Sequence, residues 1–233
     1  MILSTPGLVL HTTPYGDSSV VVKVFTRQLG VRSYMIKGVR GPRGRIKQNL
    51  LQPLSNIDMV VYDNPHNDLN HVKELASRRT EPEADAVGNA LRFFMTEVLY
   101  KVLPEAEPMP ELWDYVDGTD FRTSVTDFPI RFLLGLTHHL GIAPLDNYSA
   151  RESYFDLQEG CYTSVPAETT LSPHHSSMLH EYIAAAASTN SQSLSFSPTD
   201  RQALLEALIA YFQLHLSGFH NFHSHEILHT ILR

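Results

Sequence analysis

Cysteine is almost absent from this 233-residue sequence, which contains only Cys161. A single thiol cannot form a disulfide within the chain, so we expect the fold to rely on its hydrophobic core and the location to be cytoplasmic. No run of about 18 apolar residues occurs, so we expect no membrane-spanning helix. The opening residues 1–6 have neither a basic cluster nor an apolar core, and no signal peptide is expected.

The glycine patterns that bind nucleotides are also missing. Gly38, Gly41 and Gly44 are spaced by three, and no Gly-Lys-Ser/Thr follows them, so neither a Walker-type nor a Rossmann-type loop is indicated. Cys161 has no evident base partner and lies in a predicted hairpin, which favours a structural thiol over a nucleophile. The sequence therefore does not indicate nucleotide hydrolysis or thiol chemistry.

Positive charge is scarce overall but concentrated in one part of the chain. The formal charge is −7, from 18 Lys+Arg and 25 Asp+Glu. Residues 1–79 hold 11 Lys/Arg and 5 Asp/Glu, a balance of +6, whereas residues 80–233 hold 7 and 20, a balance of −13. This asymmetry predicts a module that faces nucleic acid, joined to an acidic module with another task. Chance segregation of solvated charges is the alternative.

The segment 37–47, with sequence KGVRGPRGRIK, carries five basic residues and no acid. Its glycines permit backbone conformations closed to other residues and its proline lacks an N–H, so a loop is predicted. Five cations can contact about five phosphates, which for a single strand predicts a salt slope of about −3.5, at roughly 0.7 per phosphate. A solvated linker is the alternative. The basic residues are Lys37, Arg40, Arg43, Arg45 and Lys47.

Five β-rich stretches lie on either side of this loop. Each contains β-branched or alternating apolar residues and is bounded by turn-forming residues. Five strands with short turns and one longer insertion favour an OB-fold, which often binds single-stranded nucleic acid, although a five-stranded SH3-like barrel fits nearly as well. The predicted strands cover residues 8–13, 18–26, 31–36, 54–62 and 69–75.

The strands next to the loop offer further candidates for DNA contact. Cations on these strands can extend the basic loop, namely Lys23, Arg27 and Arg32. Tyr34 and Tyr15 are candidates for stacking on bases, with packing in the core as the alternative. For Phe25, packing in the core is the favoured interpretation.

After a polar linker at residues 78–83, the apolar spacing changes from that of strands to that of helices. We therefore predict an α+β chain, with an OB-fold β-barrel over residues 1–80 and an α-helical domain over residues 81–233. A small β-hairpin near residues 154–163, with Gln-Glu-Gly at its tip, is expected to interrupt the helices.

The sequence contains 13 histidines, and His225, Glu226 and His229 form the H-E-x-x-H pattern of zinc hydrolases. The two histidines are spaced to share one helix face, and the glutamate is placed as a general base. A third ligand would have to come from upstream, from His220 or Glu206. The same residues also fit a plain amphipathic helix, so a zinc-dependent hydrolase is kept as the enzymatic alternative. A protein-interaction scaffold is a third hypothesis.

Four segments form a specific combination in the first 80 residues, and together they resemble the RecO family of bacterial DNA-repair and recombination mediators. The C-terminal part is similar in pattern only, ending in FHSHEIL at residues 222–228. The four segments are GLVLHTTPYGDSS at 7–19, FTRQLG at 25–30, IKGVR at 36–40 and LQPL at 51–54.

The resemblance implies an N-terminal OB-fold, a C-terminal α-helical domain and no enzyme activity. It further implies binding and annealing of single- and double-stranded DNA, pairing with RecR, and indirect help in loading RecA, in the cytoplasm and near the nucleoid. Some family members hold zinc through four cysteines, but this chain has only Cys161, so such a zinc ribbon is excluded, whereas ligation of a metal by histidines elsewhere is left open. No cofactor is expected.

The resemblance also implies contact with the acidic tail of the single-stranded-DNA-binding protein. Such a tail would need an apolar pocket beside a cation, and packing of these residues in the helical core is the alternative. The candidates are Phe93, Phe94, Leu133 and Leu136, with Arg92 or Arg131 as the cation.

Overall fold

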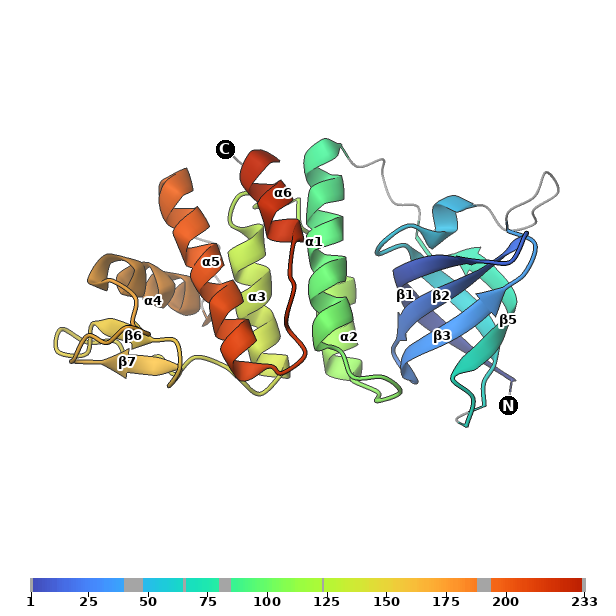
Figure 1. The fold of residues 1–233 in the computed structure, drawn as a ribbon, viewed down its shortest axis with the longest axis horizontal. Helices are drawn as coiled ribbons and strands as arrows, with labels where there is room; N and C mark the ends of the chain where they lie inside the picture. The colour runs from blue at the N-terminus through green and yellow to red at the C-terminus, as the bar shows by residue number, and fades with distance from the viewer. Residues whose placement is uncertain are drawn as a thin grey trace. The chain divides into compact units, whose positions relative to one another are not determined.

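The computed structural model describes residues 2–39, 48–64, 66–79, 85–122, 124–187 and 194–231. The chain divides into two compact units, Met1–Asp120 and Phe121–Arg233. Strands occupy the first part of the chain and helices dominate the rest, as the element labels in Figure 1 show. The predicted α+β class is confirmed.

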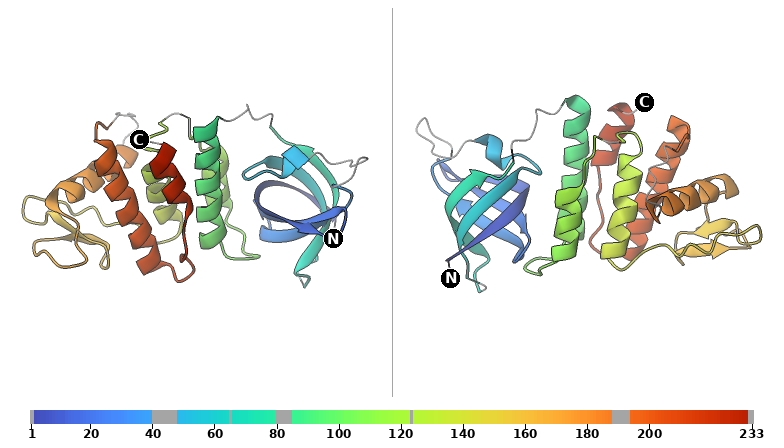
Figure 2. Two further views of the ribbon diagram at one scale, coloured as in Figure 1. Left: turned by 45° about the horizontal axis from the view of Figure 1, so that its top comes forward. Right: turned by 180° about the vertical axis from the view of Figure 1, so that it is seen from behind.

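The first unit contains a closed barrel of five strands, in the order β1-β2-β3-β5-β4. The barrel is OB-like, as predicted, and Figure 2 shows its strands from two further directions. β3 and β5 pair in parallel, whereas the other neighbours pair antiparallel. The strands are β1 (Ile2–Tyr15), β2 (Ser19–Thr26), β3 (Gly30–Ile36), β4 (Asn56–Tyr62) and β5 (Leu69–Ser77).

Alternation of apolar residues builds the barrel core. On β2, Val20, Val22 and Val24 are buried, and the residues between them are partly exposed. Tyr34 of β3 lies opposite Val22 and is completely buried with it. β1 is long enough to pair with β2 and with β4, and its register shifts between Val9 and His11. This shift lets one strand serve both neighbours as the sheet closes.

Two helices, α1 (Ala86–Val102) and α2 (Pro110–Gly118), belong to the same compact unit as the barrel. The side chain of Asp85 caps α1 by accepting a 2.8 Å hydrogen bond from the backbone N–H of Gly88. Pro110 begins α2, where its missing N–H has no intrahelical partner to lose. The unit therefore extends about 40 residues beyond the strands.

α2 is fixed to the barrel by one aromatic residue and one carboxylate. Trp113 is almost completely buried, and its Nε1–H donates to the carbonyl oxygen of Phe25 at 3.3 Å. Asp117 accepts hydrogen bonds from Arg78 at 3.1 Å, from Arg79 at 2.9 Å and from the Asn56 side chain at 2.5 Å. Because these contacts join residues far apart in sequence, they tie the helix to strands β2, β4 and the end of β5.

The chain between α1 and α2 passes close to the start of β3. The backbone N–H of Ala106 donates to the carbonyl oxygen of Val31 at 2.9 Å. Gly30 has a φ of +67°, and a Cβ at this position would lie 2.2 Å from the carbonyl oxygen of Glu107. Only glycine meets both the turn geometry and this close approach.

The second unit is a helical bundle with a small hairpin. α3 packs against α4 and α5. The fully or almost fully buried residues of the bundle include Leu133, Leu136, Tyr182 and Phe212. Strands β6 and β7 form a hairpin within the predicted range, with a left-handed backbone at Gly160. The elements are α3 (Phe128–His139), β6 (Tyr154–Asp156), β7 (Cys161–Thr163), α4 (Pro173–Ala187), α5 (Pro198–His215) and α6 (Ser224–Ile231).

None of the helices in the described ranges combines the length and the apolar character needed to cross a membrane.

Candidate nucleic-acid interface

The basic segment 37–47 leaves the barrel after β3 and returns at a short 3₁₀ helix, η1 (Gln48–Leu51). Val39 and Leu51 are both buried. The Val39 N–H donates to the Ser18 carbonyl at 2.9 Å, and the Thr12 hydroxyl donates to the Leu51 carbonyl at 2.9 Å. Both attachment points of the segment are thus held on the barrel.

Of the five basic residues predicted to contact phosphate, Lys37 is described, and it is exposed at the end of β3. The other four lie outside the described residues, namely Arg40, Arg43, Arg45 and Lys47.

A cavity of about 430 Å³ opens between the two attachment points. Its walls are formed by the second half of β1, by Val20, and by residues 51–53 after η1. His11, Thr12 and Gln52 add polar groups to an otherwise apolar lining. Tyr15 follows the cavity residue Pro14 and is 54% exposed, so its ring is accessible to a base.

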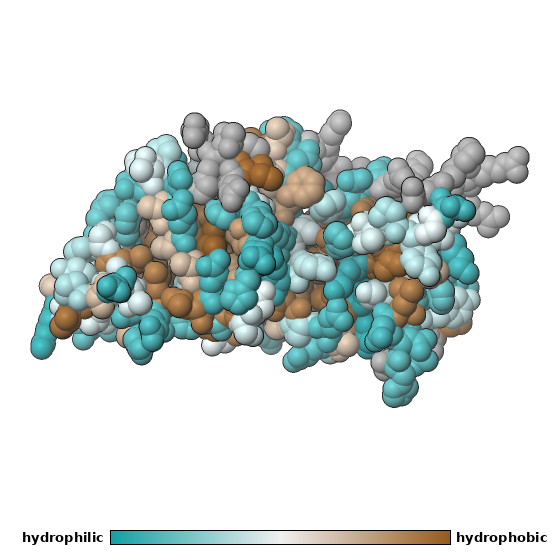
Figure 3. Space-filling view, in the orientation of Figure 1, coloured by the Kyte–Doolittle hydropathy of each residue, from teal (hydrophilic) through white to brown (hydrophobic). Residues whose placement is uncertain are grey.

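The face of the molecule seen in Figure 3 mixes hydrophilic and apolar side chains. Such a mixture is ordinary, because much of any folded surface is apolar. Surface hydropathy alone therefore does not locate the interface, and the pairing of charges is more informative.

Lys23, which we expected to extend the basic loop, is bound within the first unit instead. Its Nζ lies 2.5 Å from Glu105 Oε1 and 4.7 Å from the centroid of the Tyr100 ring. Partial burial is the largest single effect on Lys23 and lowers its pKa, but the hydrogen bonds and charges of Glu105 and Tyr100 together outweigh it and raise the pKa above its ordinary value. The side chain is held toward α1 and the segment that follows it.

Arg27 is held in the same way by α2. Its Nε and Nη2 donate to the two carboxylate oxygens of Asp114, each at 2.8 Å. That Lys23 and Arg27 extend a DNA-binding patch stays a prediction, and it is weakened because both cations have acidic partners from residues 105–114.

Most other cations of the barrel are paired as well. Four of the 11 Lys/Arg in residues 1–79 lie outside the described residues, which leaves seven. Five of these seven have an acidic partner within 4.0 Å, namely Lys23, Arg27, Lys73, Arg78 and Arg79. Most described cations of the first 79 residues are thus paired with acids of the protein. The remaining positive charge lies mainly in the basic segment 37–47.

Tyr34 of β3 does not present its hydroxyl to a ligand, whereas Arg32 stays a predicted DNA contact. Arg32 is half-buried, and its Nε has no hydrogen-bond partner in the described part of the chain. Tyr34 is fully buried, and its burial raises the pKa of its hydroxyl well above the ordinary value. Base stacking by Tyr34 was a wrong prediction. Phe25 is fully buried, as the favoured interpretation had it.

The residues expected to bind the acidic protein tail are mostly core residues. Phe94 and Leu133 are fully buried, so they cannot line an open pocket in this structure, and that expectation is corrected. Arg92 and Arg131 are half-buried, and the Arg131 guanidinium lies 5.9 Å from the centroid of the Tyr182 ring. Phe93 is the exposed aromatic residue of this group, at 54%.

The H-E-x-x-H pattern gains no geometric support. His225 is half-buried on α6, and its ring is stacked on Phe222 with centroids 5.4 Å apart. The side chains of Glu226 and His229 lie outside the described residues. Elsewhere, His174, His175 and Asp200 bring together ligand atoms at a spacing that suits a metal ion.

The sequence matches two protein-family models. The model of the Recombination protein O N-terminal domain matches residues 1–80, and that of the Recombination protein O C-terminal domain matches residues 83–224. The chain belongs to the RecO family. The RecO N-terminal match ends where the strands end, whereas the compact unit continues through α2.

Similar RecO proteins align over nearly the whole chain. The protein named DNA repair protein RecO from Porphyromonas gingivalis is 28% identical over 243 aligned positions, which cover 99% of each chain. The protein of the same name from Phocaeicola vulgatus is 28% identical over 94% of each chain. That from Flavobacterium johnsoniae is 27% identical over 99% of each chain. The resemblance to RecO is therefore confirmed at the level of the family and its role in DNA repair.

Proposed function

We propose that this RecO-family chain is a non-enzymatic recombination mediator that binds DNA strands and anneals them. The observation that carries the proposal is the basic segment 37–47, whose attachment points Val39 and Leu51 are fixed on an OB-like barrel. OB-folds commonly bind single strands. The relatives' shared name, DNA repair protein RecO, supports a task on DNA.

Annealing needs cations that screen two phosphate backbones while the bases stay free to pair. A glycine-rich segment with five cations supplies this screening without a groove that reads base edges. Because the described strand cations pair largely with acids of the same unit, the phosphates are contacted mainly by the segment itself. Binding is then independent of sequence and strongly weakened by salt.

Family membership supports three further proposals about partners. The chain pairs with RecR, contacts the acidic tail of the single-stranded-DNA-binding protein, and so helps to load RecA. An acidic tail needs an exposed cation beside an exposed apolar group, so Phe93 with its neighbour Arg92 is a better candidate than the buried Phe94 and Leu133. Arg131, in the second unit, is a separate candidate cation. Co-sedimentation of the purified chain with RecR tests the first of these partners.

Strand annealing tests the central proposal. Two complementary fluorescently labelled oligonucleotides are mixed with the chain, and the rate of duplex formation is followed by energy transfer. Replacing Arg40, Arg43 and Arg45 by Glu should bring the rate close to that without protein, because three screening charges are reversed. The matched control Arg27→Gln should anneal like the original chain. Equal rates for the triple variant and the original chain would contradict the proposal.

A further inference from the structure

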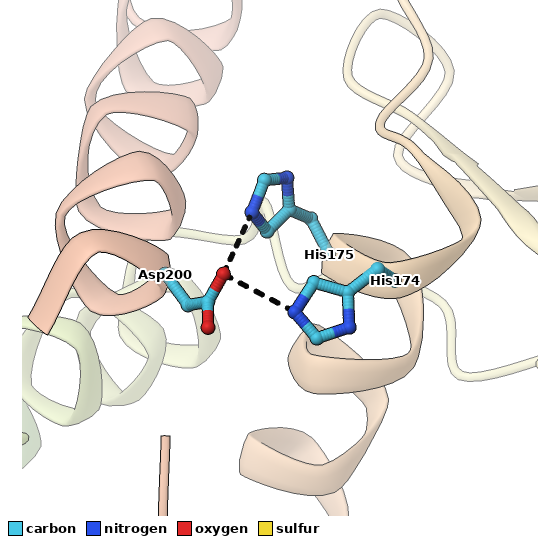
Figure 4. Close-up of side chains that lie close together, drawn as sticks. All are labelled: His174, His175 and Asp200. Atoms are coloured by element: carbon cyan, nitrogen blue, oxygen red, sulfur yellow. Dashed lines mark ion pairs between the residues drawn. The ribbon is translucent and has the colours of Figure 1, made fainter. Parts of the chain in front are cut away.

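Three potential metal ligands converge on one point in the second unit (Figure 4). His174 and His175 lie in the first turn of α4, and Asp200 lies in the first turn of α5. The Nε2 atoms of the two imidazoles lie 3.2 Å and 3.7 Å from the same carboxylate oxygen, Asp200 Oδ1. All three ligand atoms lie within 4.8 Å of one another.

Two of these side chains are oriented by hydroxyl groups on their other sides. Ser172 Oγ lies 3.2 Å from Nδ1 of His175, and Ser197 Oγ donates to Oδ2 of Asp200 at 2.7 Å. Outer partners of this kind fix the ring orientation of a ligand histidine and the rotation of a ligand carboxylate. As a result, Nε2 of His175 and Oδ1 of Asp200 are left facing the common point.

The local sequence explains why these atoms meet. Both helices begin with Ser-Pro, at Ser172 and at Ser197, and His175 and Asp200 each follow their serine by three residues. Each serine accepts a hydrogen bond from the backbone N–H of that third residue, at 3.2 Å and 3.1 Å respectively. The two helix starts are thus built alike, and each directs one ligand toward the other.

The two distances from the imidazoles to the carboxylate suit a tetrahedral zinc site, and the ligand atoms of the two imidazoles lie within 4.8 Å of each other. With zinc bonds of about 2.0–2.1 Å to nitrogen and oxygen, neighbouring ligand atoms lie about 3.3 Å apart. The distances of 3.2 Å and 3.7 Å bracket this value. The side chains of His174, His175 and Asp200 are 62%, 28% and 30% exposed, so water has access to a fourth position.

We propose that His174, His175 and Asp200 bind a Zn²⁺ ion that fastens the first turn of α4 to the first turn of α5. The competing explanation is that protonated imidazoles simply donate to a carboxylate that caps a helix. The ligand atoms of all three side chains lie close enough together to share one cation. The positive ends of two helix dipoles oppose the ion, so we expect affinity of about micromolar strength, below that of a closed four-ligand site.

This inference is independent of the proposed function, because neither DNA binding nor annealing requires the ion. It also differs from a four-cysteine zinc site, since the chain contributes two imidazoles and a carboxylate and has one cysteine.

Titration of the purified full-length chain tests the site directly. Calorimetry with Zn²⁺ should give one equivalent bound, and Co²⁺ should give the visible absorption of a tetrahedral ion. Saturating Zn²⁺ should raise the melting temperature by about 5 °C, since it binds the folded state. His174→Ala and Asp200→Asn should each weaken zinc binding by at least about tenfold and clearly reduce the shift in melting temperature.

Two controls separate this site from other histidines. His180→Ala removes another imidazole of the same unit, one whose Nδ1 lies 2.7 Å from Asp146 Oδ1, and should leave zinc binding unchanged. His225→Ala combined with His229→Ala should also leave it unchanged. Absence of stoichiometric binding to the original chain would overturn the inference. So would equal affinity in His174→Ala and the original chain, or loss of binding in the His225 and His229 variant alone.

Discussion

Arg27, directly after β2, and Asp114 of α2 are joined by two hydrogen bonds of 2.8 Å, although they lie 87 positions apart in the sequence. The pair is the simplest instance of a wider pattern, in which acids of residues 105–117 pair with cations that lie on the barrel strands or directly after them. The contrast between a basic first part and an acidic second part is therefore partly cancelled by contacts inside the first unit. The basic segment 37–47 therefore remains the main concentration of positive charge in the sequence.

The Arg27–Asp114 pair predicts a specific dependence of stability on pH. The hydrogen bond from Arg27 holds the pKa of Asp114 below its ordinary value of 3.8. The folded-state pKa is therefore below the unfolded-state pKa, so the pair stabilises the fold above pH 3.8 and loses its effect as pH falls through the folded-state value. The urea midpoint of the original chain should exceed that of Arg27→Gln at neutral pH and converge with it in acid.

Because this pair is exposed, the difference in urea midpoint should be small and should shrink in high salt. A difference that persists unchanged at acid pH would show that Arg27 stabilises the fold through packing of its stem instead of through its charge.

Gly30→Ala should destabilise the first unit strongly. The new Cβ would lie 2.2 Å from the Glu107 carbonyl oxygen, and alanine at a φ of +67° adds backbone strain. The free energy of unfolding should fall by at least about 2 kcal/mol. Urea unfolding can be followed by the fluorescence of Trp113, which is the only tryptophan and lies where α2 meets the barrel.

Gly16→Ala is the matched control for this prediction. Its φ of +58° is similarly left-handed, but a Cβ at Gly16 meets nothing within 4 Å. Its loss of stability therefore measures the backbone strain alone. Equal losses in the Gly30 and Gly16 variants would contradict a steric role for the 105–107 segment.

Tyr34→Phe should not destabilise the chain. The hydroxyl of Tyr34 is buried and has no hydrogen-bond partner among the described residues. In the folded state this hydroxyl has lost its hydrogen bonds to water without gaining one from the protein. Removing it should therefore leave the free energy of unfolding unchanged or raise it by up to about 1 kcal/mol. Thermal melts of the two proteins provide the measurement. A clear loss of stability would show that the hydroxyl has a partner, such as an ordered water.

Tyr15→Ala should weaken binding of single-stranded DNA. Its ring is 54% exposed beside the cavity at the base of the basic segment. Loss of one stacked base costs about 1 kcal/mol, which corresponds to roughly a fivefold weaker affinity. Tyr15→Phe keeps an aromatic face and should bind like the original chain. Equal affinities for the Ala and Phe variants would remove Tyr15 from the interface.

The barrel was predictable because its signals are local. Alternating valines such as those at 20, 22 and 24, and turn clusters between runs, define strands without knowledge of distant residues. The burial of Tyr34 could also have been predicted, because Tyr34 lies on the same strand face as the apolar Ile36. The basic composition of residues 37–47 was equally visible in the sequence.

The return of α2 onto the barrel could not be predicted in this way. The contacts of Asp117 with Arg78 and Arg79 join residues 38 and 39 positions apart, and no local pattern records them. The sequence therefore could not reveal that Lys23 and Arg27 pair with acids of residues 105–114. The meeting of His174, His175 and Asp200 likewise depends on how α4 and α5 pack.

The salt dependence of single-strand affinity tests the central claim most directly. Fluorescence anisotropy with a labelled oligonucleotide gives the dissociation constant at several salt concentrations for the original chain, for a variant with Arg40, Arg43 and Arg45 replaced by Gln, and for Arg27→Gln. Loss of three phosphate contacts should reduce the slope of log affinity against log salt by about 2, whereas Arg27→Gln should keep the original slope. An unchanged slope in the triple variant, or an equal reduction in Arg27→Gln, would contradict the assignment of phosphate binding to the basic segment.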